Sequence, residues 1–169
     1  MTYPIVKYGD SVLEKPTEPI TVFDDELRQL VQDMFESMYE AHGVGLAANQ
    51  IGIPKRLAVI DITFKEDPKQ KLVLINPTII HVEGHNSQSE GCLSLPDFRE
   101  KVTRPSRVTV RAQDAYGNWF EHTGEDLLAR ALAHETDHLD GRLYISHISA
   151  LKRDLIRRKI RKLMKDGEW

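Results

Sequence analysis

Apolar side chains recur every three or four residues in three stretches of the chain, a spacing that predicts amphipathic helices. In the first stretch they are Phe23, Leu27, Leu30, Val31, Met34, Phe35 and Met38. Thr21, with Asp24 three residues later, is the expected cap of this helix. The last stretch starts near Ser149, and its stripe comprises Leu151, Leu155, Ile156, Ile160, Leu163 and Met164. Each of these helices should bury one face against the rest of the molecule.

The middle helix is predicted from about Thr123 to Leu139. Glu125 and Asp126 lie in its first turn, where negative charge is favourable, and Gly141 follows its end. Short runs rich in Val, Ile and Thr predict strands at Leu57–Thr63, Leu72–Ile75, Thr78–Val82, Arg107–Arg111 and Asn118–His122. These runs lie too close together for crossover helices, so we expect antiparallel or mixed sheets.

The pattern as a whole predicts an α+β fold, with one compact domain over residues 1–169 and small sheets around the middle helix. The 40% of hydrophobic residues is enough for a real core. A net charge of −3 does not suit a protein that coats DNA or RNA. No apolar run approaches the roughly 18 residues of a membrane span. A start without a targeting pattern and a single cysteine, Cys92, favour the cytoplasm.

Residues 134–138, with the sequence HETDH, form an HExxH motif inside the middle helix. Helical residues four apart share a face, so His134 and His138 can reach the same metal ion. Glu135 directly follows the first histidine, where its carboxylate can reach a metal-bound water without being a ligand. The motif therefore predicts a metal site with two histidine ligands.

A catalytic metal usually has three protein ligands, so one more is required. The metalloprotease pattern HExxHxxGxxH has Tyr144 in place of its last histidine, and the only glutamate after the motif is Glu168. His147 stays open as a ligand. Taken alone, Cys92 could be a buried apolar residue, a nucleophile or a ligand. It is the best candidate for the third ligand, because a thiolate is a soft and strong donor.

Three separated segments, in this order, resemble the motifs of peptide deformylases. They are residues 43–50 (GVGLAANQ), 90–94 (EGCLS) and 134–141 (HETDHLDG). Ala133 stands where the family often has a glutamine, which is not a ligand position. The resemblance covers most of the chain. It implies hydrolytic removal of the formyl group from the N-terminal formylmethionine of new polypeptides.

The resemblance also implies roles for single residues. One divalent metal would be held by Cys92, His134 and His138. Fe²⁺ is the expected native metal, with Zn²⁺, Ni²⁺ or Co²⁺ as replacements. Glu135 would take a proton from the metal's water and deliver it to the departing amine. The Gln50 side-chain amide and the Leu93 backbone N–H resemble the family's oxyanion donors.

Further residues are expected to contact the substrate. Leu127, Arg130 and Ala131 precede His134 by seven, four and three positions and share its helix face, which predicts that they border a pocket for the methionine side chain. Gly43 and Gly45 leave room for a peptide that adds as a strand. Contacts are also expected from Val44, Gly91 and Arg99. Asp137 should either accept an N–H from a ligating histidine or pair with an arginine such as Arg104.

The last helix region, residues 151–169, holds eight Lys or Arg and three acidic residues. An excess of five positive charges could bind ribosomal RNA, where the substrate emerges, although a charge run usually marks a solvated helix face.

Three other hypotheses use the same residues. A ribosome- or RNA-associated module with a structural zinc would need a fourth protein ligand, and would not need Glu135 or Gln50. An endopeptidase would leave the deformylase-like segments unexplained. A hydrolase with Cys92 as nucleophile would leave the metal one ligand short.

Overall fold

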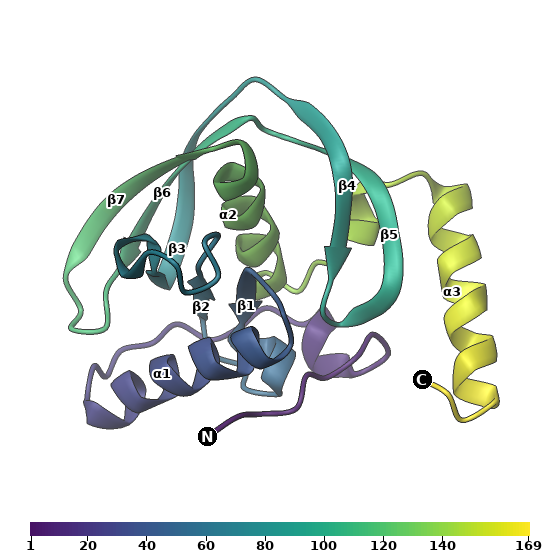
Figure 1. Ribbon diagram of the computed structural model, residues 1–169, viewed down its shortest axis with the longest axis horizontal. Helices are drawn as coiled ribbons and strands as arrows, with labels where there is room; N and C mark the ends of the chain where they lie inside the picture. Colours follow the sequence, from purple (N-terminus) through teal and green to yellow (C-terminus); the bar gives the residue numbers. More distant parts are fainter.

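Two antiparallel sheets and three α-helices make up the computed structural model, which describes residues 1–169 (Figure 1). The larger sheet has the strand order β1-β2-β3-β6-β7. Its strands are β1 (Gly45–Ala47), β2 (Leu57–Ile60), β3 (Leu72–Glu83), β6 (Arg107–Gln113) and β7 (Trp119–Glu125). The smaller sheet is a hairpin of β4 (Asn86–Cys92) and β5 (Leu95–Arg104). The α+β prediction is confirmed, and all strand pairs are antiparallel.

Helix α1 (Asp25–Glu40) covers β1 and β2 with its predicted apolar stripe. Val31, Met34 and Met38 are buried there. The predicted cap was wrong: Asp24, not Thr21, accepts a hydrogen bond from the Leu27 backbone N–H, at 3.0 Å. A carboxylate adjacent to the first turn caps it directly, so the residue three positions earlier is not needed.

Helix α2 (Asp126–Leu139) lies at the centre of the molecule, between the large sheet and the β4–β5 hairpin (Figure 1). It begins three residues later than predicted, because Thr123 and Glu125 pair with β6 at the end of β7. It ends as predicted, since Gly141 follows with φ of 80°. A Cβ there would lie 2.8 Å from the backbone of Lys15, so this position requires glycine.

The strand prediction needs several corrections. The strand β1 was not predicted, and the run at residues 57–63 is a strand only as far as Ile60. The runs at residues 72–75 and 78–82 belong to one strand, β3, whose pairing with β6 shifts between Ile75 and Thr78. The hairpin strands β4 and β5 were not predicted at all. β4 reads NSQSEGC and has none of the β-branched or aromatic residues that reveal strands in a sequence.

Helix α3 (Ala150–Lys165) lies at the edge of the molecule and begins close to its predicted start, with Ser149 as its cap. Only Ile156 and Ile160 are buried, against a core that includes Leu13 and Tyr144. The rest of its surface is mostly exposed, and it includes three residues of the predicted apolar stripe, Leu151, Leu155 and Met164, beside the charged ones. None of the three helices has the length and apolar composition to cross a membrane.

Candidate metal centre and active site

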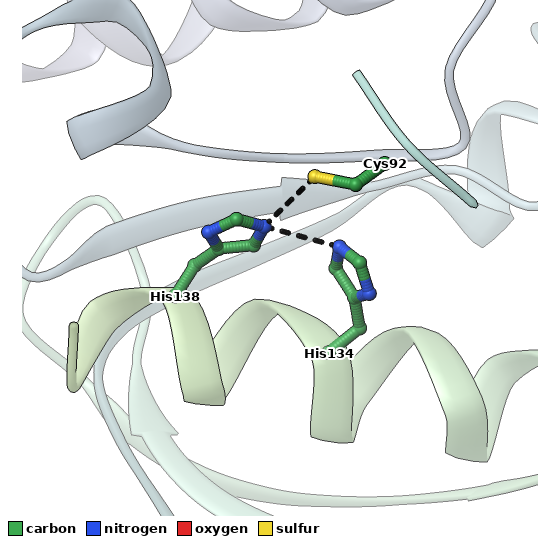
Figure 2. A group of neighbouring side chains, drawn as sticks. All are labelled: Cys92, His134 and His138. Atoms are coloured by element: carbon green, nitrogen blue, oxygen red, sulfur yellow. Dashed lines mark hydrogen bonds between the residues drawn. The ribbon is translucent and has the colours of Figure 1, made fainter. Parts of the chain in front are cut away.

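Cys92, His134 and His138 converge at one point between β4 and α2 (Figure 2). The His138 Nε2 atom lies 3.2 Å from the Cys92 Sγ and 3.1 Å from the His134 Nε2. All three donor atoms lie within 4.8 Å of one another. The turn spacing of α2 brings the two imidazoles together, and the last residue of β4 adds the thiol from the opposite side.

The donor set fits a divalent metal. The His134 Nδ1–H donates to the Glu90 carboxylate at 2.7 Å, which leaves Nε2 as the free, metal-binding nitrogen. Burial lowers the pKa of His138, which favours the neutral imidazole that a metal requires. The cluster offers three side chains that could hold a metal ion, and His147 is not among them. Three ligands leave a coordination position open, as in catalytic metal sites.

Glu90 accepts several of the hydrogen bonds around the centre, a role that was not predicted from the sequence. Its two oxygens accept hydrogen bonds from His134, from Arg104 at 2.7 and 3.0 Å, and from Arg130 at 2.9 Å. Burial raises the pKa of Glu90, but the bonds from His134 and Arg104 more than offset this and hold it well below its usual range. Strand alternation could not have revealed it, because β4 was not predicted and its pairing with β5 shifts between Gly91 and Cys92.

Asp137 pairs with Arg104, which decides between the two predicted partners. The Arg104 Nη1 donates to its carboxylate at 2.6 Å, and the His147 Nε2 lies 2.7 Å from the same oxygen. Burial raises the pKa of Asp137, and these two partners together bring it below its ordinary value. Arg104 thus links the acid on α2 to Glu90 on β4.

Glu135 is buried beside the cluster, and its carboxylate is not held by a hydrogen bond. Its Oε1 has no partner, and its Oε2 lies 4.0 Å from the His134 Nε2. Burial raises the pKa of Glu135 to about 7, against the opposing effect of His134. A Cβ on Gly45 would lie 2.5 Å from Oε2, so the missing side chain makes room for this carboxylate. A carboxyl group in this state suits proton transfer near neutral pH.

Gln50 is held in a short 3₁₀ turn (Ala48–Ile51) that faces Cys92. Its Oε1 accepts from the Ala47 N–H at 3.0 Å, which fixes the orientation of the amide. Its Nε2 donates to the Ser94 Oγ at 3.2 Å and lies 3.6 Å from the Cys92 Sγ. Ser94 is fully buried, and its contact with Gln50 was not predicted. The amide group therefore points its donors toward the centre.

Leu93 occupies the turn between β4 and β5, immediately after the cysteine. A Cβ on Gly43 would lie 2.7 Å from the Leu93 Cδ1. The two glycines of the GVGLAANQ segment thus leave space for Leu93 and Glu135. This space was predicted to admit an approaching peptide, and both uses are compatible because β1 is an edge strand.

A cavity of about 220 Å³ opens beside the cluster. Its lining includes every residue predicted to contact the substrate: Val44, Gly45, Gly91, Arg99, Leu127 and Ala131. Leu127 is half-exposed at its rim. The Arg99 guanidinium is directed to Ser89, with hydrogen bonds to the Oγ at 3.0 Å and the carbonyl at 3.1 Å. Arg130 also lines the cavity, but its guanidinium is turned away to Glu90.

Comparisons with known proteins agree with this geometry. The sequence model of the polypeptide deformylase family matches residues 2–154. A peptide deformylase of Acidobacterium capsulatum is 66% identical over 169 residues, which cover 100% of this chain and 99% of the relative.

Solved structures show the same likeness. A peptide deformylase from Legionella pneumophila matches with a TM-score of 0.91 and 44% identity, covering 99% of this chain and 98% of that one. The peptide deformylase from Thermus thermophilus matches with a TM-score of 0.90 and 38% identity, again covering 99% and 98%. These matches confirm the resemblance in the sequence and give no support to the structural-zinc module. The chain therefore belongs to the polypeptide deformylase family.

Proposed function

We propose that this protein hydrolyses the formyl group from the N-terminal formylmethionine of nascent polypeptides, using a divalent metal held by Cys92, His134 and His138. One observation carries the proposal: the buried Glu135, with an unpartnered oxygen, stands beside a three-ligand centre that borders a cavity. A structural metal site has no need for such an acid. Family membership supports the formamide as substrate.

When bound, the metal lowers the pKa of water toward ~7 and polarises a carbonyl group, which makes formamide hydrolysis feasible at neutral pH. We take Fe²⁺ as the native metal, following the family resemblance. A thiolate and two imidazoles also accept Zn²⁺, Ni²⁺ and Co²⁺. Metal analysis of protein purified without oxygen, followed by reloading with each ion, tests this choice.

Glu135 is the proton carrier in this mechanism. It accepts the proton of the attacking water as the new C–O bond forms, and donates it to the amine nitrogen as the C–N bond breaks. Formate and a peptide with a free amino group are the products. The raised pKa of Glu135 suits both steps, because a group with a pKa near the working pH can act as base and then as acid.

Gln50 and Leu93 stabilise the negative charge that develops on the formyl oxygen. The Gln50 Nε2 already points toward the Cys92 Sγ, and the Leu93 backbone N–H directly follows the cysteine in the turn. Donors arranged before the reaction cost no reorganisation when charge appears, and loss of one typically lowers the rate by about 10²–10³-fold.

The cavity receives the start of the peptide. We assign Leu127 and Ala131 to the methionine side chain, and Val44, Gly45 and Gly91 to the peptide backbone, which would extend the edge of the sheet at β1. Arg99 lies at the cavity and would contact the backbone further along. Leu127→Trp should raise KM for a formylmethionyl peptide, and an unchanged KM would contradict this placement.

The basic face of α3 is the proposed contact with the ribosome, which would place the enzyme with nascent chains in the cytoplasm. Its exposed cations with neither an ion pair nor a side-chain hydrogen bond are Arg158, Lys159, Arg161, Lys162 and Lys165. Changing all five to glutamine should weaken ribosome binding and reduce its salt dependence, because fewer phosphates are neutralised. An unchanged salt dependence would refute this contact.

The experiment that tests the proposed function compares two peptides and two states of the enzyme. Formyl-Met-Ala-Ser and acetyl-Met-Ala-Ser are offered to chelator-treated protein and to protein reloaded with Fe²⁺, Ni²⁺ or Zn²⁺. We expect release of free amine from the formyl peptide alone, and only after reloading. No turnover with any metal, despite one ion bound per chain, would overturn the proposal.

A further inference from the structure

The ligands of the proposed metal centre come from two separate pieces of structure. His134 and His138 belong to α2, whereas Cys92 belongs to the β4–β5 hairpin. No strand of this hairpin is hydrogen-bonded to the five-stranded sheet against which α2 packs. The distance between the thiol and the imidazoles therefore depends on whatever fastens the hairpin to the helix.

Arg130 fastens the hairpin at three points. From α2, its Nη1 donates to the Glu90 Oε1 and to the Val102 carbonyl, each at 2.9 Å. Its Nη2 donates to the Asn86 Oδ1 at 2.7 Å and to the Asn86 carbonyl at 3.2 Å. The side chain is 8% exposed. One guanidinium thus joins α2 to the start of β4, to the residue two before Cys92, and to β5.

Arg104 cannot replace these contacts. It binds Glu90 from β5, within the same hairpin, and reaches α2 only through Asp137. Arg130 is the arginine that extends from α2 itself, one turn before His134. Glu90 in turn holds the His134 ring by its Nδ1–H. The position of Glu90 therefore affects a histidine ligand through its carboxylate and Cys92 through the strand.

We propose that Arg130 is a positioning residue that fixes the distance between Cys92 and the two histidines before metal binds. The proposal rests on the assignment of Cys92, His134 and His138 as ligands. The planar guanidinium of arginine is required, because four acceptor atoms from three residues on two strands must be bound at once. A lysine at this position can satisfy the charge of Glu90 but cannot also bind Val102 and Asn86.

The predicted consequence is a loss of metal affinity that exceeds any general loss of stability. Groups that orient metal ligands from outside typically contribute 10- to 100-fold to affinity. Arg130→Met should weaken Co²⁺ binding by about this factor, and Arg130→Lys by less. The thiolate-to-cobalt charge-transfer band of saturated Arg130→Met should also shift or weaken, since the thiol is no longer held in place.

Arg28 provides a matched control. It donates to the carbonyls of Phe23 and Ala115 at 3.1 and 3.2 Å and to the Asp25 carboxylate at 2.8 Å, so it also joins separate segments, but far from the centre. Arg28→Met should lower the free energy of unfolding and leave Co²⁺ affinity and spectrum unchanged. A general stability effect would instead lower affinity in both variants.

The test measures the Co²⁺ affinity of each protein by competition with a chelator. Spectra are recorded at saturation, and urea unfolding is measured for each metal-free protein. The proteins compared are wild type, Arg130→Met, Arg130→Lys, Asn86→Ala and Arg28→Met. If Arg130→Met does not fold, Asn86→Ala, which removes one side-chain contact of the guanidinium, decides with a smaller loss of affinity. Affinity within twofold of wild type, or an equal loss in Arg28→Met, overturns the proposal. Because these are binding measurements, they stand even if deformylation itself is not found.

Discussion

The helix α2 and the β4–β5 hairpin both contribute residues to the proposed metal centre, but different forces hold them in place. α2 is fastened by apolar packing: Leu132 and Leu139 are fully buried against strands of the large sheet. The hairpin is fastened to α2 largely by buried charges, with Glu90 between Arg104 and Arg130. Global stability and the position of the ligands can therefore be changed separately, because the first depends on apolar packing and the second on buried charged groups.

The two pieces also differ in how their ligands are spaced. The interval between His134 and His138 follows from one turn of helix and is set by the chain itself. The interval from either histidine to Cys92 spans more than forty residues and exists only in the folded protein. It is therefore the interval that mutations outside the ligand set can change.

The largest expected effect is on the hairpin side. Cys92→Ala removes the only ligand from β4, and two histidines on one helix face do not make a closed binding site. Bound metal should fall from one ion per chain toward zero, with loss of activity, as measured by elemental analysis after gel filtration. His147→Ala is the control and should keep its metal, since His147 lies outside the cluster. Full metal content in Cys92→Ala would show that the hairpin supplies no metal ligand.

A large effect on stability is expected on the helix side. Leu132→Ala deletes a fully buried side chain at the contact between α2 and the sheet, which should cost about 2–5 kcal/mol of unfolding free energy. Urea unfolding of the metal-free protein measures this cost. Metal affinity of the folded fraction should stay within twofold of wild type. A loss of affinity as large as that expected for Arg130→Met would show that the two regions are not separable.

A smaller effect, on the pH dependence of stability, is expected at Asp61, a second buried acid whose hydrogen-bond donors are uncharged. Asp61, at the end of β2, accepts hydrogen bonds from the Tyr39 hydroxyl, the Thr63 hydroxyl and N–H, and the Lys65 N–H. Burial raises its pKa, but these donors lower it to about 2, from 3.8. The unfolded chain therefore binds the proton more tightly, so the stabilisation is complete above pH 3.8 and is lost as the pH falls through 2.

The free energy of unfolding of wild type and of Asp61→Asn is measured as a function of pH. Wild type should lose on the order of 2 kcal/mol as the pH falls through this window, in addition to the acid loss that both proteins share. Asp61→Asn should lack that component, because it has no proton to bind. Parallel curves for the two proteins would contradict the assignment.

The sequence predicted the regions in which one local pattern determines the structure. Apolar spacing located α1, α2 and α3, and the HExxH motif placed two imidazoles on one face. The hairpin was missed because β4 is mostly polar and contributes the buried charge of Glu90, although Leu95 and Val102 of β5 are fully buried in an apolar core. The place of Cys92 was inferred from ligand chemistry and the family resemblance, whereas no local pattern reveals which distant arginines bind Glu90.

The predicted start of α2 was wrong because tertiary contacts compete there with the local preference for helix. Thr123 and Glu125 carry helix-start features, but hydrogen bonding with β6 keeps them in a strand. Arg130 was placed correctly on the cavity face by helix periodicity. Its guanidinium could not be placed, because a long flexible side chain turns to whichever buried acceptors the fold supplies.

Glu135 carries the proton in the proposed metal-dependent deformylation. The direct test is the kcat for formyl-Met-Ala-Ser of wild type, Glu135→Gln and the exposed-site control Glu26→Gln, each with one metal ion per chain. The account predicts that Glu135→Gln keeps its metal and loses about 10²–10⁴-fold in kcat, while Glu26→Gln matches wild type. A kcat for metal-loaded Glu135→Gln within a few-fold of wild type would contradict it.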